Sequence, residues 1–98
     1  MFEMTVGLLV VDHEKYAQYR TAIAPLLDGA RGRFRYDVEV ARTLKSEAGH
    51  DINRLFVIQF PDRAAKERFF ADPQYVSIRQ RLFETAVERF VIIAEYER

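Results

Sequence analysis

One feature constrains the fold of this chain more than any other: a strand stops at a proline, and two capped helix starts follow it. Leu55 to Phe60 is an apolar run interrupted only by Gln59, and Pro61 ends it because proline has no amide hydrogen for a sheet ladder. Asp62 predicts the start of one helix, and Asp72-Pro73 predicts another by an acidic cap before proline. These residues therefore predict a strand packed beside helices.

The amino-terminal third predicts a strand and one long helix. Phe2 to Val11 is rich in β-branched and large apolar residues, which favours a strand covered on both faces. Asp12 is expected to cap a helix that continues to about Ala30. Its apolar stripe contains Tyr16, Tyr19, Ile23, Leu26 and Ala30. Pro25 is expected to kink this helix or to begin its last turns.

The middle of the chain predicts a hairpin, and the end predicts a helix and a strand. Arg33 to Val40 alternates, with Phe34, Tyr36, Val38 and Val40 on one face and Arg33, Arg35, Asp37 and Glu39 on the other. The polar run Lys45 to Asn53 is typical of a connecting loop. Phe90 to Tyr96 predicts the last strand. Before it, a second helical stripe is predicted at Tyr75, Ile78, Leu82 and Ala86.

The predicted order is strand, helix, strand, strand, helix, strand, which is the ferredoxin-like βαββαβ plan. We therefore expect an α+β fold: one domain over residues 1–98, with a four-stranded antiparallel sheet and helices on one face. The strands at Leu55 to Phe60 and Phe90 to Tyr96 are apolar on both faces, yet two helices cover only one face. Because a large apolar face is rare on a monomer, we predict a homodimer formed face to face.

Composition excludes several classes of partner and chemistry. Fifteen basic and fifteen acidic residues balance, so no positive field favours nucleic acid or an anionic membrane as partner. The chain has no cysteine, which fits a cytoplasmic protein without disulfides. The two histidines lack the spacing of metal ligands, and no glycine-rich phosphate loop is present. We therefore predict no metal and no cofactor.

Two segments carry a resemblance to a known family. VVDHEKYAQYRTAIAP, at residues 10–25, and VIQFPDRAAKERFFADPQYVSIR, at residues 57–79, resemble the domain-of-unknown-function 1330 family of the dimeric α/β-barrel superfamily. The matching features are Asp12, Tyr16, Tyr19, Pro25, Phe60-Pro61 and Asp72-Pro73-Gln74-Tyr75. The resemblance implies a two-sheet barrel formed by a homodimer. Superfamily relatives include cofactor-independent monooxygenases, small-lactone isomerases and dehalogenating or peroxidatic enzymes.

His13 and His50 are the candidate catalytic bases. His13 follows the first strand at the rim where loops gather, and an imidazole there can exchange protons near neutral pH. His50 lies beside Asp51 in the hairpin loop, and the hypothesis for His50 is a base that the Asp51 carboxylate orients. The alternative for both is a solvated surface side chain.

Five further residues are candidate ligand contacts: Tyr16, Tyr19, Arg35, Gln59 and Tyr75. The tyrosines lie on apolar helix stripes, so they are either core aromatics or phenols that donate a hydrogen bond to a ligand oxygen. Arg35 either belongs to a solvated edge strand or holds a carboxylate ligand. Gln59 is either a structural hydrogen-bond hub or a ligand contact.

The resemblance, together with these polar residues, gives two functional hypotheses, and a small dimeric accessory domain is a third, structural possibility. One is an enzyme that performs proton transfer or oxygenation on a small organic molecule without a cofactor. The other is a non-catalytic ligand-binding or protein-interaction module. Under the second hypothesis, no titratable group is buried beside a cavity.

Overall fold

The computed structural model, which describes residues 1–98, contains strands and helices in the predicted order. The elements are β1 (Phe2–Val10), α1 (His13–Gly29), β2 (Arg33–Glu39), β3 (Arg54–Phe60), α2 (Arg63–Ala71), α3 (Pro73–Ile78), the π-helical turn η1 (Arg79–Phe83) and β4 (Val87–Glu97). The helical region between β3 and β4 thus has three consecutive pieces: α2 and α3 begin at the two predicted caps, and η1 continues α3. Its stripe ends before Ala86, which lies in the turn to β4 and is fully buried.

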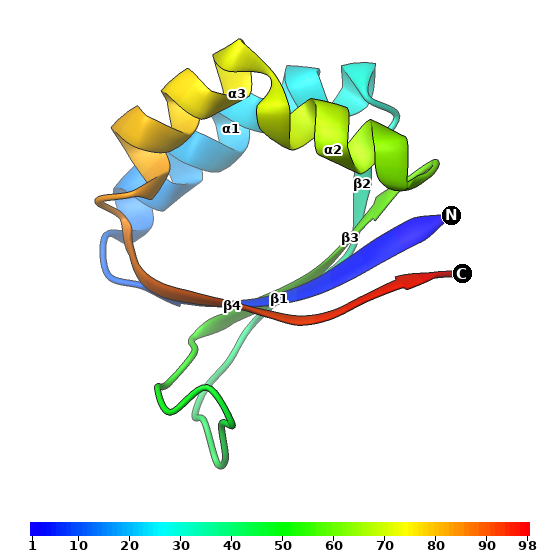
Figure 1. Ribbon diagram of the computed structural model, residues 1–98. Helices are drawn as coiled ribbons and strands as arrows, with labels where there is room; N and C mark the ends of the chain where they lie inside the picture. Colours follow the sequence, from blue (N-terminus) through cyan, green and yellow to red (C-terminus); the bar gives the residue numbers. More distant parts are fainter.

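The four strands form one antiparallel sheet in the order β2-β3-β1-β4, with β1 and β3 in the centre. All the helices lie on one face of this sheet, and the two chain ends lie side by side at one end of it (Figure 1). This arrangement confirms the predicted α+β, ferredoxin-like fold. No helix is both long and apolar enough to cross a membrane.

Side-chain caps begin the helices where the sequence predicts them. The Asp12 carboxylate accepts from the Lys15 amide at 3.0 Å, and Asp62 accepts from the Ala65 amide at 2.8 Å. Asp72 accepts from the Gln74 amide at 2.8 Å, directly before Pro73. Such caps satisfy amides that have no partner within the helix, each worth about 1 kcal/mol. The α1 helix continues past Pro25 to Gly29.

The core lies between the sheet and the helices. Every second residue of β1 points into it, from Phe2 to Val10, because side chains alternate along a strand. Ile58 and Phe60 of β3 join them on the same face. The helices contribute Tyr16, Tyr19, Ile23, Leu27, Ala65, Phe69 and Tyr75. The predicted apolar stripes therefore form the core, although Leu26 and Ala30 are only partly buried at its edge.

The predicted alternation along the second strand is wrong beyond Arg35. A register shift separates Phe34, which pairs with Ile58, from Tyr36, which pairs with the next residue of β3, Val57. The extra residue, Arg35, forms a β-bulge, and a bulge exchanges the two faces for all residues that follow. Tyr36 and Val38 consequently point to the open face, where they are 59% and 47% exposed. Asp37 points to the helix side.

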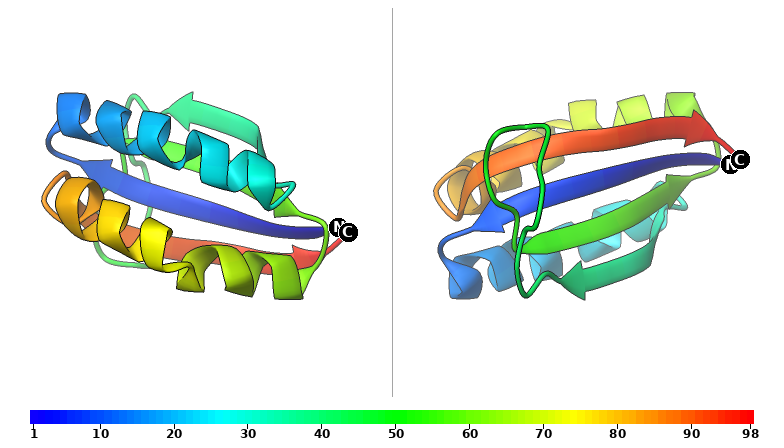
Figure 2. Two further views of the ribbon diagram at one scale, coloured as in Figure 1. Left: turned by 90° about the horizontal axis from the view of Figure 1, so that it is seen from above. Right: turned by 90° about the horizontal axis from the view of Figure 1, so that it is seen from below.

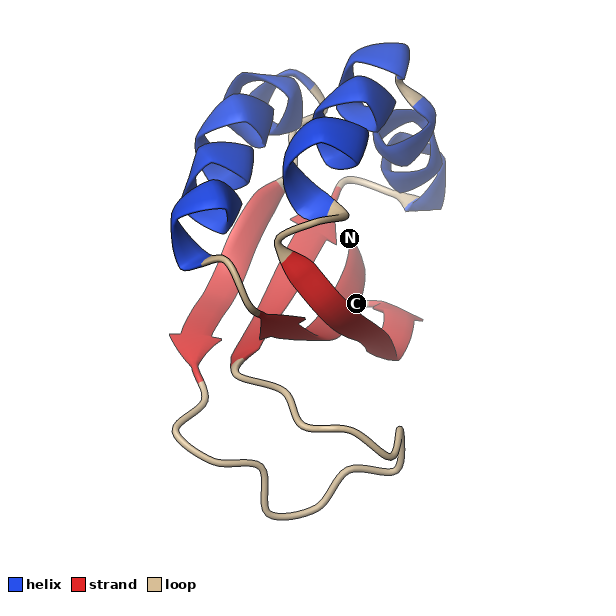
Figure 3. Cartoon of the chain, turned by 90° about the vertical axis from the view of Figure 1, so that its left-hand side faces the viewer, coloured by secondary structure: helices blue, strands red, loops and turns tan.

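The second face of the sheet carries no helix. Residues 40–53 form a loop that projects beyond this face, as Figure 3 shows, and it passes across one end of the sheet when viewed from below (Figure 2). Ile52 of this loop packs over Gly7, where an added Cβ would lie 3.1 Å from two Ile52 carbons. The remainder of the open face contains partly exposed apolar side chains, among them Leu55 and Val57.

Candidate functional site

An apolar cavity lies between the sheet and the α2, α3 and η1 segments. Its volume is about 520 Å³, within the 300–1,000 Å³ range that is usual for small-molecule sites. Twelve of the fifteen lining residues are hydrophobic. The sheet contributes Met4, Val6, Leu8, Phe56, Ile58, Phe90 and Ile92, and the helices contribute Tyr19, Lys66, Glu67, Phe70, Ala71, Tyr75, Arg79 and Phe83. Because Phe90 and Ile92 belong to the edge strand β4 and are exposed, the cavity opens along that edge.

Tyr19 and Tyr75 provide a buried hydroxyl pair in the wall of this cavity. Their oxygens lie 2.8 Å apart, and the two residues are 6% and 4% exposed. Burial raises the pKa of both phenols well above the ordinary value, so both are protonated at neutral pH. One hydroxyl donates to the other, and the second hydroxyl proton has no protein acceptor. The pair can therefore donate one hydrogen bond to an oxygen atom in the cavity.

Tyr16 lies next to this pair but belongs to a different polar group. Its ring centre is 5.7 Å from that of Tyr19, and its hydroxyl accepts from Arg20 at 3.2 Å. Arg20 and Arg54 both donate to Asp37, at 3.0 Å and 2.8 Å. Burial raises the pKa of Tyr16, while the Arg54 hydrogen bonds lower the pKa of Asp37. This group ties α1 to the β2-β3 hairpin, and Tyr16 does not line the apolar cavity.

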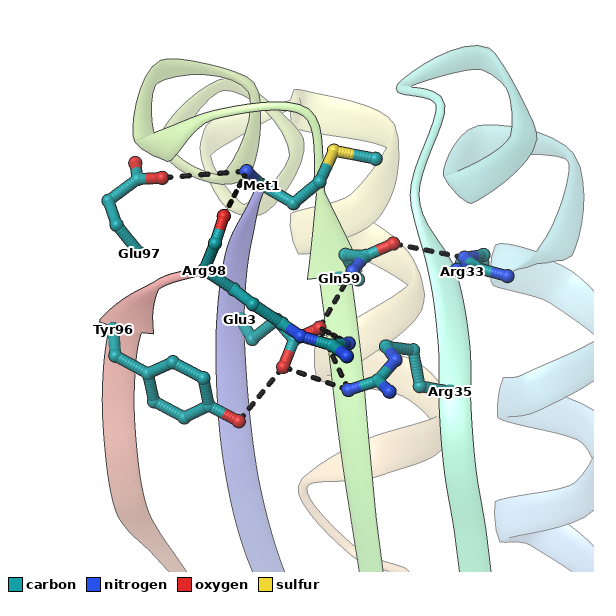
Figure 4. Close-up of polar contacts among 8 residues, drawn as sticks. All are labelled: Met1, Glu3, Arg33, Arg35, Gln59, Tyr96, Glu97 and Arg98. Atoms are coloured by element: carbon teal, nitrogen blue, oxygen red, sulfur yellow. Dashed lines mark hydrogen bonds and ion pairs between the residues drawn. The ribbon is translucent and has the colours of Figure 1, made fainter.

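A second polar cluster occupies the open face of the sheet around Glu3 (Figure 4). Glu3 is fully buried, and its carboxylate accepts from Gln59 at 2.7 Å and from Tyr96 at 2.9 Å. Arg35 donates to both carboxylate oxygens, at 3.1 and 3.0 Å, and Arg98 donates at 3.3 Å. The cluster thus crosses the full width of the sheet. We call it the Glu3 cluster, consisting of Glu3, Arg33, Arg35, Gln59, Tyr96 and Arg98.

The charge on Glu3 is compensated inside the protein. Burial alone would raise the pKa of Glu3, but the hydrogen bonds from Tyr96, Gln59 and Arg98 and the positive charge of Arg35 outweigh it, so the pKa is lowered. The carboxylate is therefore ionised at neutral pH. The charge partner of Arg35 is thus an internal carboxylate.

Gln59 connects two side chains by hydrogen bonds, which is the structural hub role that was one of its two predicted roles. Its amide nitrogen donates to Glu3, and its amide oxygen accepts from Arg33 Nε at 3.0 Å. It lies on the open face, away from the apolar cavity. Direct ligand binding by Arg35 or Gln59 stays a prediction.

Neither histidine lines the apolar cavity, and the two histidines lie in different parts of the structure. His13 is exposed at the start of α1 and lines a smaller cavity of about 200 Å³ together with Glu39, Asn53 and Arg54. His50 lies in the long loop, where its Nδ1 contacts the Asp51 backbone oxygen at 3.0 Å. The Asp51 carboxylate makes no hydrogen bond with it, and the assignment of both histidines as bases stays a prediction.

Asn53 is a structural residue that the sequence did not single out. Its side chain accepts from the Val10 amide at 2.8 Å and donates to the Val10 carbonyl at 2.8 Å. The side-chain amide thus continues the β1-β3 ladder by one more pair after Leu8 and Arg54. Glu3 and Arg79 were also missed, because nothing local in the sequence marks a buried carboxylate or a residue at a cavity. No group of three or more histidine, aspartate or glutamate side chains is arranged to hold a metal ion.

Comparisons with known proteins agree on the fold. A protein of unknown function from Rhodopseudomonas palustris is 18% identical, with a TM-score of 0.80 over 99% of this chain and 81% of that chain. A DABB-family protein with a ferredoxin-like fold from Mesorhizobium loti is 21% identical, with a TM-score of 0.64 over 99% and 95% of the two chains. A protein from Bacteroides fragilis, described as dimeric, of unknown function and ferredoxin-like, is 16% identical, with a TM-score of 0.60 over 99% and 95%.

A search among curated proteins finds no match. The family model described as a domain of unknown function, DUF1330, matches residues 5–96, which is nearly the whole chain. The resemblance seen in the sequence is thereby confirmed, and this chain belongs to the DUF1330 family.

Proposed function

We propose that this protein binds a small, mainly apolar organic molecule in the cavity between the sheet and the helices, without a cofactor. The observation that carries the proposal is the Tyr19-Tyr75 hydroxyl pair, which has one proton without a protein acceptor in the wall of an otherwise apolar cavity. Apolar walls with a few polar groups are typical of small-molecule sites. The ligand would therefore place a carbonyl or hydroxyl oxygen at the pair and its hydrocarbon part against the sheet.

Binding is better supported than catalysis by a histidine. Neither His13 nor His50 lines this cavity. Tyr19 and Tyr75 are titratable groups buried beside it, which departs from the criterion set for the non-catalytic hypothesis. Both are protonated at neutral pH because burial raises their pKa. Protonated phenols donate hydrogen bonds but do not accept a proton from a substrate. Glu67, at the exposed rim, is the only carboxylate that lines the cavity.

We further propose that the protein works as a homodimer whose two sheets face each other. The open face carries Tyr36 and Val38, which are 59% and 47% exposed. A standard interface buries about 800 Å² on each partner, and partly exposed apolar side chains extend across this face. The solved protein from Bacteroides fragilis, which shares the fold, is described as dimeric.

The cavity proposal is tested by titrating two neutral probes with the same carbon skeleton, 4-phenylbutan-2-one and butylbenzene, with chemical shifts as the readout. The double variant Tyr19→Phe/Tyr75→Phe is expected to bind the ketone about fivefold more weakly, because one neutral hydrogen bond is worth about 1 kcal/mol. The hydrocarbon is expected to bind both proteins equally. Equal ketone affinity in the two proteins would refute the role of the hydroxyl pair.

Blocking the cavity gives an independent test. Ala71 lines the cavity and Ala64 does not, although both are exposed residues of α2. Ala71→Trp is expected to abolish binding of both probes, whereas Ala64→Trp leaves binding unchanged. Probe binding that survives Ala71→Trp would place the site elsewhere.

The dimer is tested by the solution mass from light scattering. Val38→Asp puts a charge on the open face and is expected to give monomers. Val76→Asp is the matched control, because Val76 is 38% exposed on α3, on the opposite side of the molecule. A monomeric wild-type protein, or a dimer that tolerates Val38→Asp, would contradict the face-to-face assembly.

A further inference from the structure

Arg79 is the one cation of the apolar cavity that has no acidic partner. It lies in η1, is partly buried, and lines the cavity. The other lining cation, Lys66, is paired with Glu95 at 3.2 Å. None of the six ion pairs of the molecule includes Arg79, and its side chain donates no hydrogen bond to another protein group. The guanidinium is therefore available to a bound molecule.

The position of Arg79 brings its charge close to both the aromatic wall and the hydroxyl pair. Its guanidinium carbon lies 5.7 Å from the centre of the Phe83 ring and 5.9 Å from that of Phe90. Burial raises the pKa of Tyr19 and Tyr75, and the Arg79 charge opposes this shift at both residues. A cation, a hydroxyl donor and apolar walls thus converge on one cavity. Two aromatic faces hold the guanidinium there without neutralising it.

We infer that the ligand of this cavity is an amphiphilic monocarboxylate, with its carboxylate at Arg79 and its apolar body between the sheet and the helices. A guanidinium matches a carboxylate with two parallel hydrogen bonds. An ionised carboxylate enters an apolar cavity only where such a partner compensates its lost hydration. The inference rests on the proposed function, because it requires the cavity to be the binding site.

Glu67 limits the ligand to one carboxylate. It lines the exposed rim of the cavity on α2, which is separated from η1 by the whole of α3 (Figure 1). Its negative charge disfavours a second carboxylate at that end. The far end of the ligand is therefore expected to be uncharged.

The test compares 4-phenylbutanoate with its neutral amide, 4-phenylbutanamide, at pH 7, using chemical-shift titration of the labelled full chain. The wild type is expected to bind the carboxylate about tenfold more tightly than the amide, the ratio that one charge-assisted hydrogen bond gives. Arg79→Gln is expected to remove this preference by weakening only the carboxylate, whereas Arg79→Lys, which keeps the charge, retains part of it.

The matched control is Arg81→Gln. Arg81 lies in the same turn, is exposed, and lines a different cavity, so the variant loses the same charge without changing the site. Its preference for the carboxylate is expected to equal that of the wild type. Well-dispersed amide spectra of each variant show that the fold is intact.

The outcomes separate this inference from the proposed function. Equal affinity of the wild type for both probes, with shifts confined to cavity residues, would refute the carboxylate preference and leave the binding cavity standing. Loss of the preference in both Arg79→Gln and Arg81→Gln would mean that general charge, not Arg79, selects the carboxylate. Absence of shifts at cavity residues with either probe would refute both proposals.

Discussion

Replacing Glu3 by glutamine is expected to lower the free energy of unfolding by about 2 to 3 kcal/mol at pH 7. The substitution keeps the shape of the side chain but removes the charge and turns one acceptor oxygen into a donor. The carboxylate now accepts from four residues of the Glu3 cluster: Arg35, Gln59, Tyr96 and Arg98. After the change, the side-chain nitrogen of the new glutamine is itself a donor, and it lies where a carboxylate oxygen accepted hydrogen bonds.

The magnitude follows from the exposure of each donor. A hydrogen bond to a charged group is worth about 1.5 to 3 kcal/mol. The Arg98 side chain is 55% exposed, so it regains water when its partner is lost and contributes little. The Arg35 side chain is only 21% exposed, and Glu3 itself is not exposed at all. About one strong charge-assisted bond and part of a second are therefore lost.

The assay is urea and thermal unfolding followed by circular dichroism, at one fixed protein concentration because the proposed dimer would make stability depend on concentration. For a chain of this size, about 1 kcal/mol corresponds to about 4 to 8 °C, so the midpoint should fall by about 10 to 20 °C. The control is Glu97→Gln, since the Glu97 side chain is 63% exposed and lies 3.7 Å from the terminal amine. That control should cost less than about 0.5 kcal/mol.

The pH dependence gives the sign of the effect. The pKa of Glu3 is lowered in the folded protein from an ordinary value of 4.5. A lowered pKa means that the carboxylate stabilises the fold fully above the unfolded pKa and loses this effect as the pH falls through the folded pKa. The gap between wild type and Glu3→Gln should therefore be constant above about pH 5 and shrink below about pH 4.5. A gap no larger than that of Glu97→Gln at pH 7, or one that widens on acidification, would refute the reasoning.

Three further predictions concern stability. Asn53→Ala removes the two side-chain hydrogen bonds to Val10 and should cost about 2 kcal/mol by urea unfolding, whereas a neutral result would show that water replaces the amide. Gly32→Ala should destabilise by about 1 to 3 kcal/mol, because its Cβ would lie 2.5 Å from a Leu27 methyl carbon; unchanged stability would mean that this side chain moves aside at little cost. In an ultraviolet titration, three of the five tyrosines should ionise above the ordinary phenol pKa of about 10. The free energy of unfolding should fall as the pH rises past that value, because these phenols ionise more easily in the unfolded chain. Ionisation of all five near pH 10 in the folded protein would contradict their burial. These three are Tyr16, Tyr19 and Tyr75.

The fold could be predicted because its signals are local. The caps at Asp12, Asp62 and Asp72 are read from residues three positions apart or fewer, and all three form the expected hydrogen bonds. The apolar periods of the strands and helices likewise place most of the core on the correct faces. Pro25 lies within the last turns of α1, which ends at Gly29, as one of the two alternatives for this residue predicted.

The candidate site could be predicted only in part. Tyr19 and Tyr75 were candidates because each lies on an apolar stripe, but their contact joins two residues that are 56 positions apart along the chain. The bulge at Arg35 has no local signal, and it sends Tyr36 and Asp37 to faces opposite to those that alternation predicts. The sequence around Glu3 has no feature that marks it, and its role depends on hydrogen bonds from four residues of three other segments.

The sequence by itself determined the order of the elements, their caps and the family, because all of these depend on short-range spacing and on motif content. Only the tertiary structure decided which polar groups meet. It brought the tyrosine hydroxyls together, left Arg79 without an acidic partner, and buried the Glu3 charge among donors from other strands. The physical reason is that hydrogen bonds, desolvation and cavity shape depend on distances in space between residues that are remote along the chain.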